Sequence, residues 1–392
     1  METSDAELLY REATGTNSSV LTPRPRDRVR SRLGRLALCY GTRPQVVKAS
    51  ALAEGLREEW DLVSIDTGQH YDWELHGLHY QQLGVSAPDL FLEVKSATHA
   101  EQTSSMLLRV SAALEEYRPD VVVVIGDTNS TLGCALAAAK QRIYLVHVEA
   151  GLRARDFQMA EEINRRIVDE ISSLLCAPSK RSAQFLAARA SPAQTVAFTG
   201  DVARDVLERA LHLPELPMAP WARHRISRPY VLATLHRAEL TSAGDLLKAV
   251  VQGLGALPYP VFLPAHPRTI AALSQSGVGP VPDNIVLSAP VGYLEMIAWA
   301  RHADVIVTDS GGLQREAYWM GIPCVTMRSE TEWTETVEEG ANVLVPPAES
   351  SRLPRAVLEH PGRETPWNGH AYGSGRAVGA VCDALRERFG VP

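Results

Sequence analysis

Short, uniformly apolar runs recur along this chain and alternate with longer stretches of helical periodicity. Such runs suit strands that are covered by helices on both faces, which is the usual setting of a parallel sheet. A first set of runs is followed by a second: 36–39, 62–65, 121–125, 144–148, 174–177 and 195–198, then 230–234, 261–264, 285–287, 305–307, 324–326 and 342–345. The helical stretches within the first set are 50–58, 98–117, 130–140 and 161–173. The sequence therefore predicts an α/β fold.

The alternation lapses once, in the proline-rich stretch 213–221, and then restarts. A length of 392 residues suits two domains. We predict two Rossmann-like, doubly wound domains with a central cleft, in which ligands bind beyond the carboxyl ends of the strands. The predicted divisions are a mobile N-terminal extension over 1–33, domains over 34–210 and 229–370, a linker over 211–228, and a C-terminal segment over 371–392.

Charge, hydropathy and cysteine usage indicate which partners and which cellular compartment suit this chain. A formal net charge of -7 argues against a nucleic-acid partner, because phosphate contacts need a basic face. No apolar run approaches the roughly 18 residues that span a bilayer, and no signal-peptide core precedes the first domain. The five cysteines have no metal-type or redox spacing, which is typical of buried thiols in a reducing compartment. We expect a cytoplasmic protein without a membrane partner.

The loop after the first apolar run suits an anion. Gly41 permits a tight turn, and Pro44 is expected at the first helical position. The helix start would then offer unpaired N–H groups, with Arg43 and Lys48 beside them. The alternative is an ordinary strand–helix turn with exposed basic residues.

Acidic residues follow several runs of the first domain. Asp127 comes directly after the run 121–125, and Glu149 comes directly after 144–148. Glu161 and Glu162 begin a helical stretch. Repulsion and desolvation among converging acids would raise the pKa of some of them, which suits proton transfer. Asp127 taken alone could equally cap a helix.

The second domain offers a nucleotide site in the same kind of place. His236 and Arg237 follow the run 230–234. The small residues of Ser310–Gly312 follow another run and open a helix, which lets backbone N–H groups approach a phosphate. Glu316 lies further along that helix and could accept hydrogen bonds from ribose hydroxyls.

Together these segments resemble the non-hydrolysing UDP-N-acetylglucosamine 2-epimerases, whose two Rossmann-like domains have the GT-B arrangement of many glycosyltransferases. The resemblance covers residues 36 to 388. Its landmarks are Gly41-Thr-Arg-Pro, Thr67-Gly-Gln-His, Gly126-Asp-Thr-Asn-Ser-Thr, His147-Val-Glu-Ala-Gly-Leu-Arg, Glu161-Glu-Ile-Asn-Arg, His236-Arg-Ala-Glu, Thr308-Asp-Ser-Gly-Gly and Thr331-Glu-Trp-Thr-Glu. A further segment at 372–375 resembles the start of the family's last helix, which crosses back to the first domain.

The resemblance implies roles for particular residues. The expected catalytic residues are Asp127, Glu149 and Glu161, together with His236 from the UDP site. The expected substrate-binding residues are Arg43, Lys48, Arg153, Ser310, Gly311, Gly312 and Glu316. The residues expected to bind a second, activating UDP-GlcNAc are Gln69, His70 and Arg237. The resemblance also implies UDP-GlcNAc as substrate, a homodimer, and no metal or redox cofactor.

The sequence departs from the family pattern at several positions. Gln45 replaces a usual Glu, Ala160 a Pro, Leu240 an Asn, Ile125 a His or Tyr, and Ser374 an Asp. Gln45 and Leu240 lie beside ligand loops, which leaves the sugar and the activating site open.

The expected reaction inverts carbon 2 by eliminating UDP to a glycal and adding it back, which needs a proton-transfer group on each face. Two rival activities stay open: a glycosyltransferase of the same fold, and a hydrolysing epimerase that releases N-acetylmannosamine and UDP. A non-catalytic UDP-sugar sensor is a third alternative.

Overall fold

The computed structural model describes residues 33–69, 87–95, 97–213, 216, 226–237, 240, 243–265, 267–275, 280–360 and 367–390. The chain divides into two compact units, which we call unit 1 (Met1–Val206 with Tyr372–Pro392) and unit 2 (Leu207–Ala371). Residues 1–32 of the predicted extension and residues 214, 215 and 217–225 of the predicted linker lie outside the described residues.

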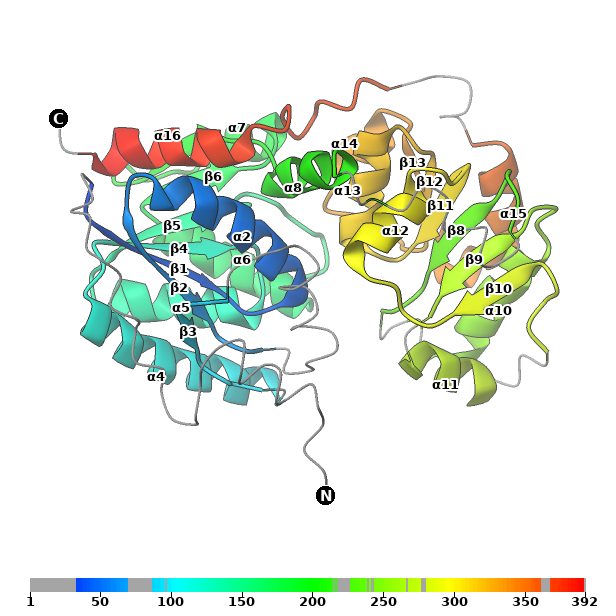
Figure 1. Cartoon of the computed structure of the whole chain (residues 1–392), viewed down its shortest axis with the longest axis horizontal. Coiled ribbons are helices and arrows are strands. Elements are labelled where there is room, and N and C mark those ends of the chain that lie inside the picture. Colours follow the sequence, from blue (N-terminus) through cyan, green and yellow to red (C-terminus); the bar gives the residue numbers. More distant parts are fainter. Residues whose placement is uncertain are drawn as a thin grey trace. The chain divides into compact units, whose positions relative to one another are not determined.

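Unit 1 is built on a parallel sheet of seven strands in the order β3-β2-β1-β4-β5-β6-β7 (Figure 1). The strands are β1 (Arg35–Tyr40), β2 (Asp61–Asp66), β3 (Leu90–Phe91), β4 (Val121–Ile125), β5 (Tyr144–Val148), β6 (Leu174–Ala177) and β7 (Thr195–Phe198). The helices that belong wholly to unit 1 are α2 (Arg43–Arg57), α4 (His99–Tyr117), α5 (Asn129–Lys140), α6 (Ala160–Ile171), α7 (Lys180–Ala187) and α16 (Ala377–Phe389). Helix α8 (Val202–Leu211) spans the boundary between the units.

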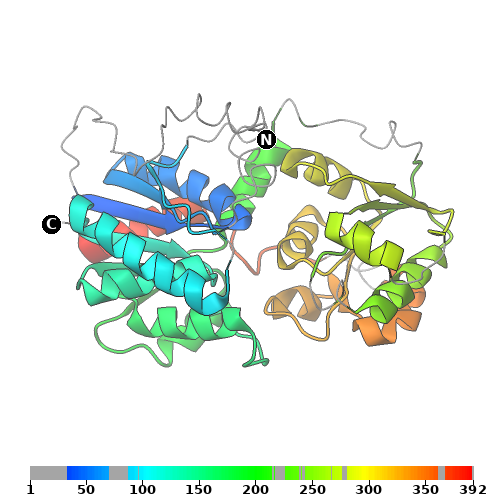
Figure 2. The ribbon, with the colours of Figure 1, turned by 90° about the horizontal axis from the view of Figure 1, so that it is seen from below.

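Both faces of the first sheet are covered, which explains why its strands are apolar throughout. Helices α4, α5 and α6 pack side by side on one face, and α2 and α16 lie on the other (Figures 1 and 2). Successive strand residues point to opposite faces. In β4, Val122 and Val124 therefore join the core under α4 and α5, while Val121 and Val123 are buried on the other face.

Unit 2 repeats this plan with a parallel sheet of six strands in the order β10-β9-β8-β11-β12-β13. The strands are β8 (Val231–Thr234), β9 (Val261–Pro264), β10 (Ile285–Ser288), β11 (Val305–Thr308), β12 (Cys324–Thr326) and β13 (Asn342–Leu344). The helices are α10 (Gly244–Gly255), α11 (Pro267–Gln275), α12 (Tyr293–Ala300), α13 (Gly311–Met320), α14 (Thr334–Glu338), the 3₁₀ helix η2 (Pro347–Arg352) and α15 (Leu353–Leu358). Val305 and Val307 face one core cluster and Ile306 faces another, so this sheet too is buried on both faces.

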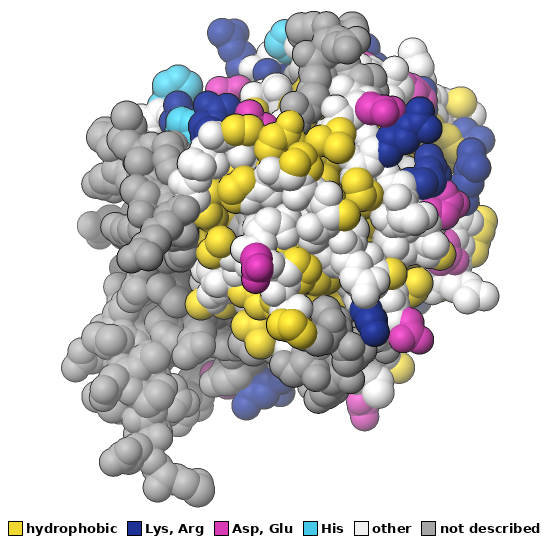
Figure 3. All heavy atoms as spheres, turned by 90° about the vertical axis from the view of Figure 1, so that its right-hand side faces the viewer, with side chains coloured by type: hydrophobic (Ala, Val, Ile, Leu, Met, Phe, Trp, Pro, Cys, Tyr) yellow, Lys and Arg dark blue, Asp and Glu magenta, His cyan; other side chains and the backbone are white. Residues whose placement is uncertain are grey.

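The face of unit 2 that Figure 3 shows is of mixed character. On the face seen in Figure 3, apolar side chains lie over the middle and charged side chains of both signs lie along one edge. Arg355 of α15 and Glu359, the residue that follows this helix, form an exposed ion pair, 2.7 Å from Nε to Oε2. An exposed pair of this kind adds little to stability.

The strand orders place one topological switch point in each sheet, because the direction of strand addition reverses between β1 and β4 and between β8 and β11. Ligands of open α/β sheets bind in the crevice outside the carboxyl ends of such strands. The predicted site residues 41–48 and 127 follow β1 and β4, and residues 236 and 310–316 follow β8 and β11.

These sheets confirm the predicted fold class, α/β with two Rossmann-like, doubly wound sheets of GT-B type. Strands β4, β5, β6, β7, β9 and β12 occupy the predicted residues. Strand β3 was not predicted, because it has two residues and pairs only with the end of β2. Helix α2 begins at Arg43, so Pro44 is its second residue rather than its first.

Candidate active site

The loops at the carboxyl edge of the first sheet approach one another closely at Gly41. A Cβ atom at this position would lie 1.9 Å from Thr67 Oγ1 and 2.3 Å from Ser130 Oγ. These two hydroxyls are themselves hydrogen bonded at 2.7 Å. Gly41 is therefore needed for space, because any side chain would separate the loops that follow β1, β2 and β4.

Gln45 joins the β1–α2 loop to the β4–α5 loop. Its Oε1 accepts hydrogen bonds from the backbone N–H groups of Gly41 (3.0 Å) and Thr42 (3.1 Å). Its Nε2 donates to the Ile125 carbonyl (2.6 Å) and lies 2.9 Å from Thr131 Oγ1. Two departures from the family pattern, Gln45 and Ile125, thus meet through this bond.

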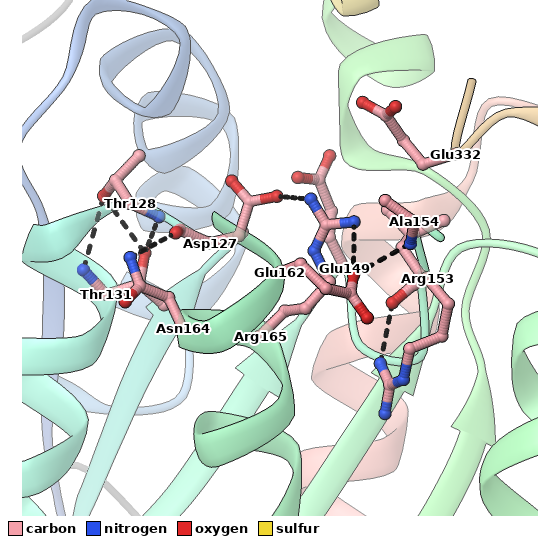
Figure 4. A network of polar contacts seen from close by, with 12 residues as sticks. Asp127, Thr128, Thr131, Glu149, Arg153, Ala154, Glu162, Asn164, Arg165 and Glu332 are labelled. Carbon is pink, nitrogen blue, oxygen red and sulfur yellow. Dashed lines mark hydrogen bonds and ion pairs between the residues drawn. The ribbon is translucent and has the colours of Figure 1, made fainter. Parts of the chain in front are cut away.

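Asp127 lies just beyond β4 and is held by helix α6 (Figure 4). Its Oδ2 lies 2.5 Å from a guanidinium nitrogen of Arg165, whose side chain is 3% exposed. Asn164 Nδ2 donates to the Asp127 carbonyl at 2.9 Å. An opposite charge at this distance favours the ionised carboxylate.

Glu149 follows β5 in a strained conformation. Its φ of 71° lies in the left-handed region, which costs a residue other than glycine about 1–3 kcal/mol. Its Oε1 lies 2.6 Å from Lys48 Nζ, and both side chains are buried. Its Oε2 lies 3.3 Å from the Cβ position that a side chain at Gly126 would take. Strands β4 and β5 are neighbours, so Asp127 and Glu149 leave the sheet side by side.

Glu162, rather than its neighbour Glu161, joins the network around Asp127. The Glu162 carboxylate is fully buried, accepts the Ala154 N–H at 2.8 Å, and pairs with Arg165 (3.2 Å) and Arg166 (2.6 Å). Glu161 is exposed in the first turn of α6, and its catalytic role stays a prediction. The spacing along the sequence does not choose between the two acids, because Arg165 also lies four residues after Glu161, and the packing of α6 selects Glu162.

His147 lies buried in β5 at the centre of a second network. Its Nδ1 lies 2.7 Å from Asp169 Oδ1, and its Nε2 lies 2.7 Å from the Gly126 carbonyl oxygen. Arg153, a predicted substrate-binding residue, donates to Asp169 at 2.6 Å and to its neighbour's carbonyl at 2.7 Å. Burial raises the pKa of Asp169, but the bonds and charges of His147 and Arg153 outweigh this, so that the pKa lies below its ordinary value.

The residues predicted for diphosphate and activator binding are placed as follows. Lys48 is engaged with Glu149, and Arg43 is the half-buried first residue of α2. Gln69 Oε1 accepts from the backbone N–H (3.0 Å) and hydroxyl (2.8 Å) of Ser130 at the start of α5. His70 lies outside the described residues. Arg237 lies in unit 2, where its backbone N–H donates to Asp309 at 2.9 Å.

In unit 2, Asp309 joins the two loops at the switch point. Its Oδ2 accepts the backbone N–H groups of His236 (2.8 Å) and Arg237 (2.9 Å), and its Oδ1 lies 2.9 Å from His236 Nδ1. Burial raises the pKa of Asp309, but these bonds outweigh it and lower the pKa below its ordinary value. The His236 side chain is about half exposed, so its other ring nitrogen can face a ligand. Asp309 lies in the landmark Thr308-Asp-Ser-Gly-Gly, yet the sequence analysis did not name it as a site residue.

Helix α13 begins at the other side of this switch point. Ser310 caps it by accepting the Leu313 N–H at 3.3 Å. A Cβ at Gly312 would meet nothing nearer than Ser310 Oγ at 3.7 Å, so this part of the helix start is open. Glu316 accepts a hydrogen bond from Tyr293 on α12; burial first and then this carboxylate raise the pKa of Tyr293.

Among the residues that the structure describes, no group of three or more His, Cys, Asp or Glu side chains is arranged to hold a metal ion. Within that same part of the chain, no helix is long and apolar enough to cross a membrane.

The fold and both edges define a class: a two-unit α/β protein with a Rossmann-type ligand edge on each sheet. Comparison with known proteins specifies it further. Residues 54–386 match the family model described as UDP-N-acetylglucosamine 2-epimerase. A Methanococcus maripaludis protein named "UDP-N-acetylglucosamine 2-epimerase homolog" is 37% identical over 90% of this chain and 99% of its own. The UDP-2,3-diacetamido-2,3-dideoxy-D-glucuronate 2-epimerase of Pseudomonas aeruginosa is 36% identical over 88% and 98%.

A solved structure agrees. The Methanocaldococcus jannaschii UDP-GlcNAc 2-epimerase, crystallised with UDP-GlcNAc and UDP, superposes with a TM-score of 0.82 at 34% identity, over 90% of this chain and 99% of that one. The chain belongs to the UDP-N-acetylglucosamine 2-epimerase family. It is accordingly an enzyme of the isomerase kind.

Proposed function

We propose that this protein interconverts UDP-GlcNAc and UDP-ManNAc without hydrolysis. The observation that carries the proposal is the pair of carboxylates, Asp127 and Glu149, at the ends of adjacent strands, each bonded to a buried cation. Proton transfer at carbon 2 needs groups of this kind. The names of the relatives support the nucleotide sugar, although the Pseudomonas relative acts on a different one.

The C2 proton of the sugar is not acidic while C1 carries the diphosphate. As the C1–O bond breaks, its electron pair leaves with UDP, and positive charge develops on C1. The C2–H electrons then form the C1=C2 double bond of a glycal, and the proton moves to a carboxylate. UDP adds back to C1 through a diphosphate oxygen, while a protonated carboxylic acid on the opposite face of the sugar gives its proton to C2 and becomes a carboxylate. The nucleotide sugar is regenerated with C2 inverted.

In unit 1 we assign the proton transfers to Asp127, Glu149 and Glu161 collectively. Lys48 and Arg165 lie beside Glu149 and Asp127, and a nearby cation favours the ionised form of a carboxylate that accepts a proton. The member of this set that gives a proton to C2 must start the step protonated. Lys48, Arg43 and Arg153 would also attract the charge that develops on UDP.

In unit 2 we assign the nucleotide to the loops after β8 and β11. The N-terminus of α13, with Ser310, Gly311 and Gly312, suits a phosphate because its N–H groups and helix dipole favour an anion. His236, oriented by Asp309, would stabilise the leaving diphosphate. The carboxylate of Glu316 would accept hydrogen bonds from the ribose hydroxyls. Gln69, His70 and Arg237 are proposed for a second, activating nucleotide sugar.

We also propose a homodimer through α4 and α6, which flank α5 on one face of unit 1. Leu108 on α4 and Ile163 and Ile167 on α6 are large apolar side chains that unit 1 leaves exposed. Light scattering of the wild type and of Ile163→Lys tests this, because a monomeric wild type would contradict it.

The five cysteines are buried and form no disulfide, which supports a cytoplasmic location.

The decisive experiment incubates the full chain with UDP-GlcNAc in D2O and follows the sugar by proton NMR and mass spectrometry. UDP-ManNAc with deuterium at C2 and no free sugar supports the proposal. Free ManNAc with UDP would establish a hydrolysing enzyme instead, and transfer to an acceptor without exchange would indicate a glycosyltransferase. Parallel incubation with UDP-2,3-diacetamido-2,3-dideoxy-D-glucuronate tests the other sugar: exchange there alone overturns the substrate assignment.

A further inference from the structure

Three consecutive backbone carbonyls at the end of β4 each receive a hydrogen bond from a buried side chain. Gln45 Nε2 donates to the Ile125 oxygen at 2.6 Å, and His147 Nε2 donates to the Gly126 oxygen at 2.7 Å. Asn164 Nδ2 donates to the Asp127 oxygen at 2.9 Å. The donors come from three different elements, α2, β5 and α6, and each is less than 5% exposed.

The donor atom of each side chain is identified by its partners. The Gln45 oxygen is occupied by two backbone N–H groups, so its NH2 group must face Ile125. The Asn164 nitrogen faces a second acceptor, Asn129 Oδ1, at 3.3 Å. The carbonyl oxygen of Gly126 can only accept a hydrogen bond, so the Nε2 atom of His147 is the donor in this contact.

This arrangement restrains a turn that would otherwise be loose. Gly126 has a φ of 67°, and glycine can leave such a conformation more readily than any other residue. It directly precedes Asp127, so rotation at Gly126 would move the carboxylate. Misplacing a reacting group by about 1 Å can cost about a hundredfold in rate.

We propose that Gln45, His147 and Asn164 are positioning residues that hold the Ile125–Asp127 backbone, and with it the Asp127 carboxylate, in one place beside Glu149. This inference rests on the proposed function, in which Asp127 transfers a proton. Arg165 already fixes the charged end of Asp127, and its neighbour Asn164 fixes the carbonyl from the same helix turn. The three donors act before substrate binds, so they should affect turnover rather than affinity.

Two substitutions of His147 separate the two ring nitrogens. The amide nitrogen of His147→Gln can reach the place of Nε2 and keep the bond to Gly126, while the bond to Asp169 is lost. The amide nitrogen of His147→Asn reaches the place of Nδ1, so it keeps Asp169 and loses Gly126. Both variants lose one buried hydrogen bond, at a cost of about 1–3 kcal/mol, and His147→Gln should be the less stable of the two because it loses the bond to the Asp169 carboxylate.

The proposal predicts different activities for this pair. His147→Asn should lose about a hundredfold in kcat, with KM and UDP affinity changed by less than about threefold. His147→Gln should stay within about tenfold of the wild type. With substrate deuterated at C2, the isotope effect on kcat should rise in His147→Asn only, because proton removal becomes slower there. Equal losses in both variants, or losses that follow thermal stability alone, would overturn the proposal.

Gln45 has a matched control in the same unit. Gln194 also uses its Nε2 to hold carbonyls, those of Asp169 (2.8 Å) and Ser172 (2.9 Å), but it precedes β7 at the other edge of the sheet. Gln45→Leu should lower kcat about tenfold or more, while Gln194→Leu should lower only the stability. Equal kcat values in these two variants would contradict a positioning role for Gln45.

Asp127→Asn separates failure of this inference from failure of the proposed function. If Asp127→Asn keeps full turnover, the catalytic assignment of Asp127 is wrong. If Asp127→Asn abolishes turnover while His147→Asn and Gln45→Leu keep theirs, only the positioning inference is wrong.

Discussion

Removing Lys48 tests whether the buried pair with Glu149 is a necessary part of unit 1. Lys48 Nζ lies 2.6 Å from Glu149 Oε1, and the two side chains are only 8% and 7% exposed. Lys48→Met keeps most of the side-chain volume and removes the charge. Glu149 then stays buried beside an apolar group, on a backbone that is already in a left-handed conformation.

The expected cost follows from burial. Breaking a buried ion pair by removing one partner typically costs about 3–5 kcal/mol, because the remaining charge is left uncompensated. Replacing both partners by neutral side chains of similar size is often close to neutral. We therefore expect Lys48→Met to lower the free energy of unfolding by about 3 kcal/mol, and Lys48→Met/Glu149→Gln to recover about 2 kcal/mol of that loss.

The assay is urea unfolding at pH 8 and pH 5.5 for the wild type, both single variants and the double variant. Lower pH should relieve Lys48→Met, because a protonated carboxyl is cheaper to bury than an ionised one. The double variant should show no such relief. Arg355→Met removes one partner of an exposed pair of similar length and should leave the free energy of unfolding unchanged.

Three results would refute this reasoning. A cost below about 1 kcal/mol for Lys48→Met at pH 8 would mean that water or other groups compensate Glu149. A double variant that is less stable than Lys48→Met would show that the cost of Lys48→Met does not come from the uncompensated charge of Glu149. The third result would be a smaller loss of unfolding free energy for Lys48→Met at pH 8 than at pH 5.5, each measured against the wild type at the same pH. That pH dependence would be opposite in sign to the one expected.

Three further outcomes are expected. Gly41→Ala should lower the free energy of unfolding by about 3 kcal/mol or more, because its Cβ would overlap the hydroxyls of Thr67 and Ser130. The control, Gly379→Ala, has nothing within 4 Å of its Cβ and should raise the free energy of unfolding by about 0.5–1 kcal/mol. Folding lowers the pKa of Asp309, so its contribution to stability is present above the unfolded pKa of about 3.9 and is lost as pH falls through the folded pKa. Asp309→Asn should flatten that loss in urea unfolding between about pH 5 and pH 3, and an unchanged slope would contradict it. Native protein at pH 8 should not react with a thiol-specific dye, because all five cysteines are buried and burial raises the pKa of Cys176 and Cys324 to about 12; rapid labelling of two thiols would contradict this.

The sequence predicted most strands because a strand that helices cover on both faces consists of apolar residues throughout. Val121–Ile125 is buried on both faces, so every residue of the run is apolar and the strand is visible in the sequence. Strand β3 depends on its pairing with Ile65 and Asp66 at the end of β2, and two residues carry no pattern of their own.

The positions of the candidate site residues at the strand ends were predicted for a similar reason. Carboxyl ends of parallel strands meet at one edge, so acids after β4 and β5 were expected together, and Asp127 and Glu149 lie there. The partners were not predicted, since Lys48 pairs with a residue 101 positions away and Arg165 with one 38 positions away. Of the two adjacent acids at the start of α6, only the packing of that helix decides that Glu162 is buried.

By itself, the sequence determined the class of fold, the two sets of strands and the loops that hold the candidate site residues, because hydrophobic periodicity and glycine positions are local properties. Tertiary structure alone decided which side chains hold which carbonyls and which cations meet which carboxylates. Gln45, His147 and Asn164 lie far apart in the chain, and only the order of β1, β4 and β5 in the sheet brings their donors to three consecutive carbonyls. Such contacts depend on angstrom-scale geometry between distant segments, and no local pattern records it.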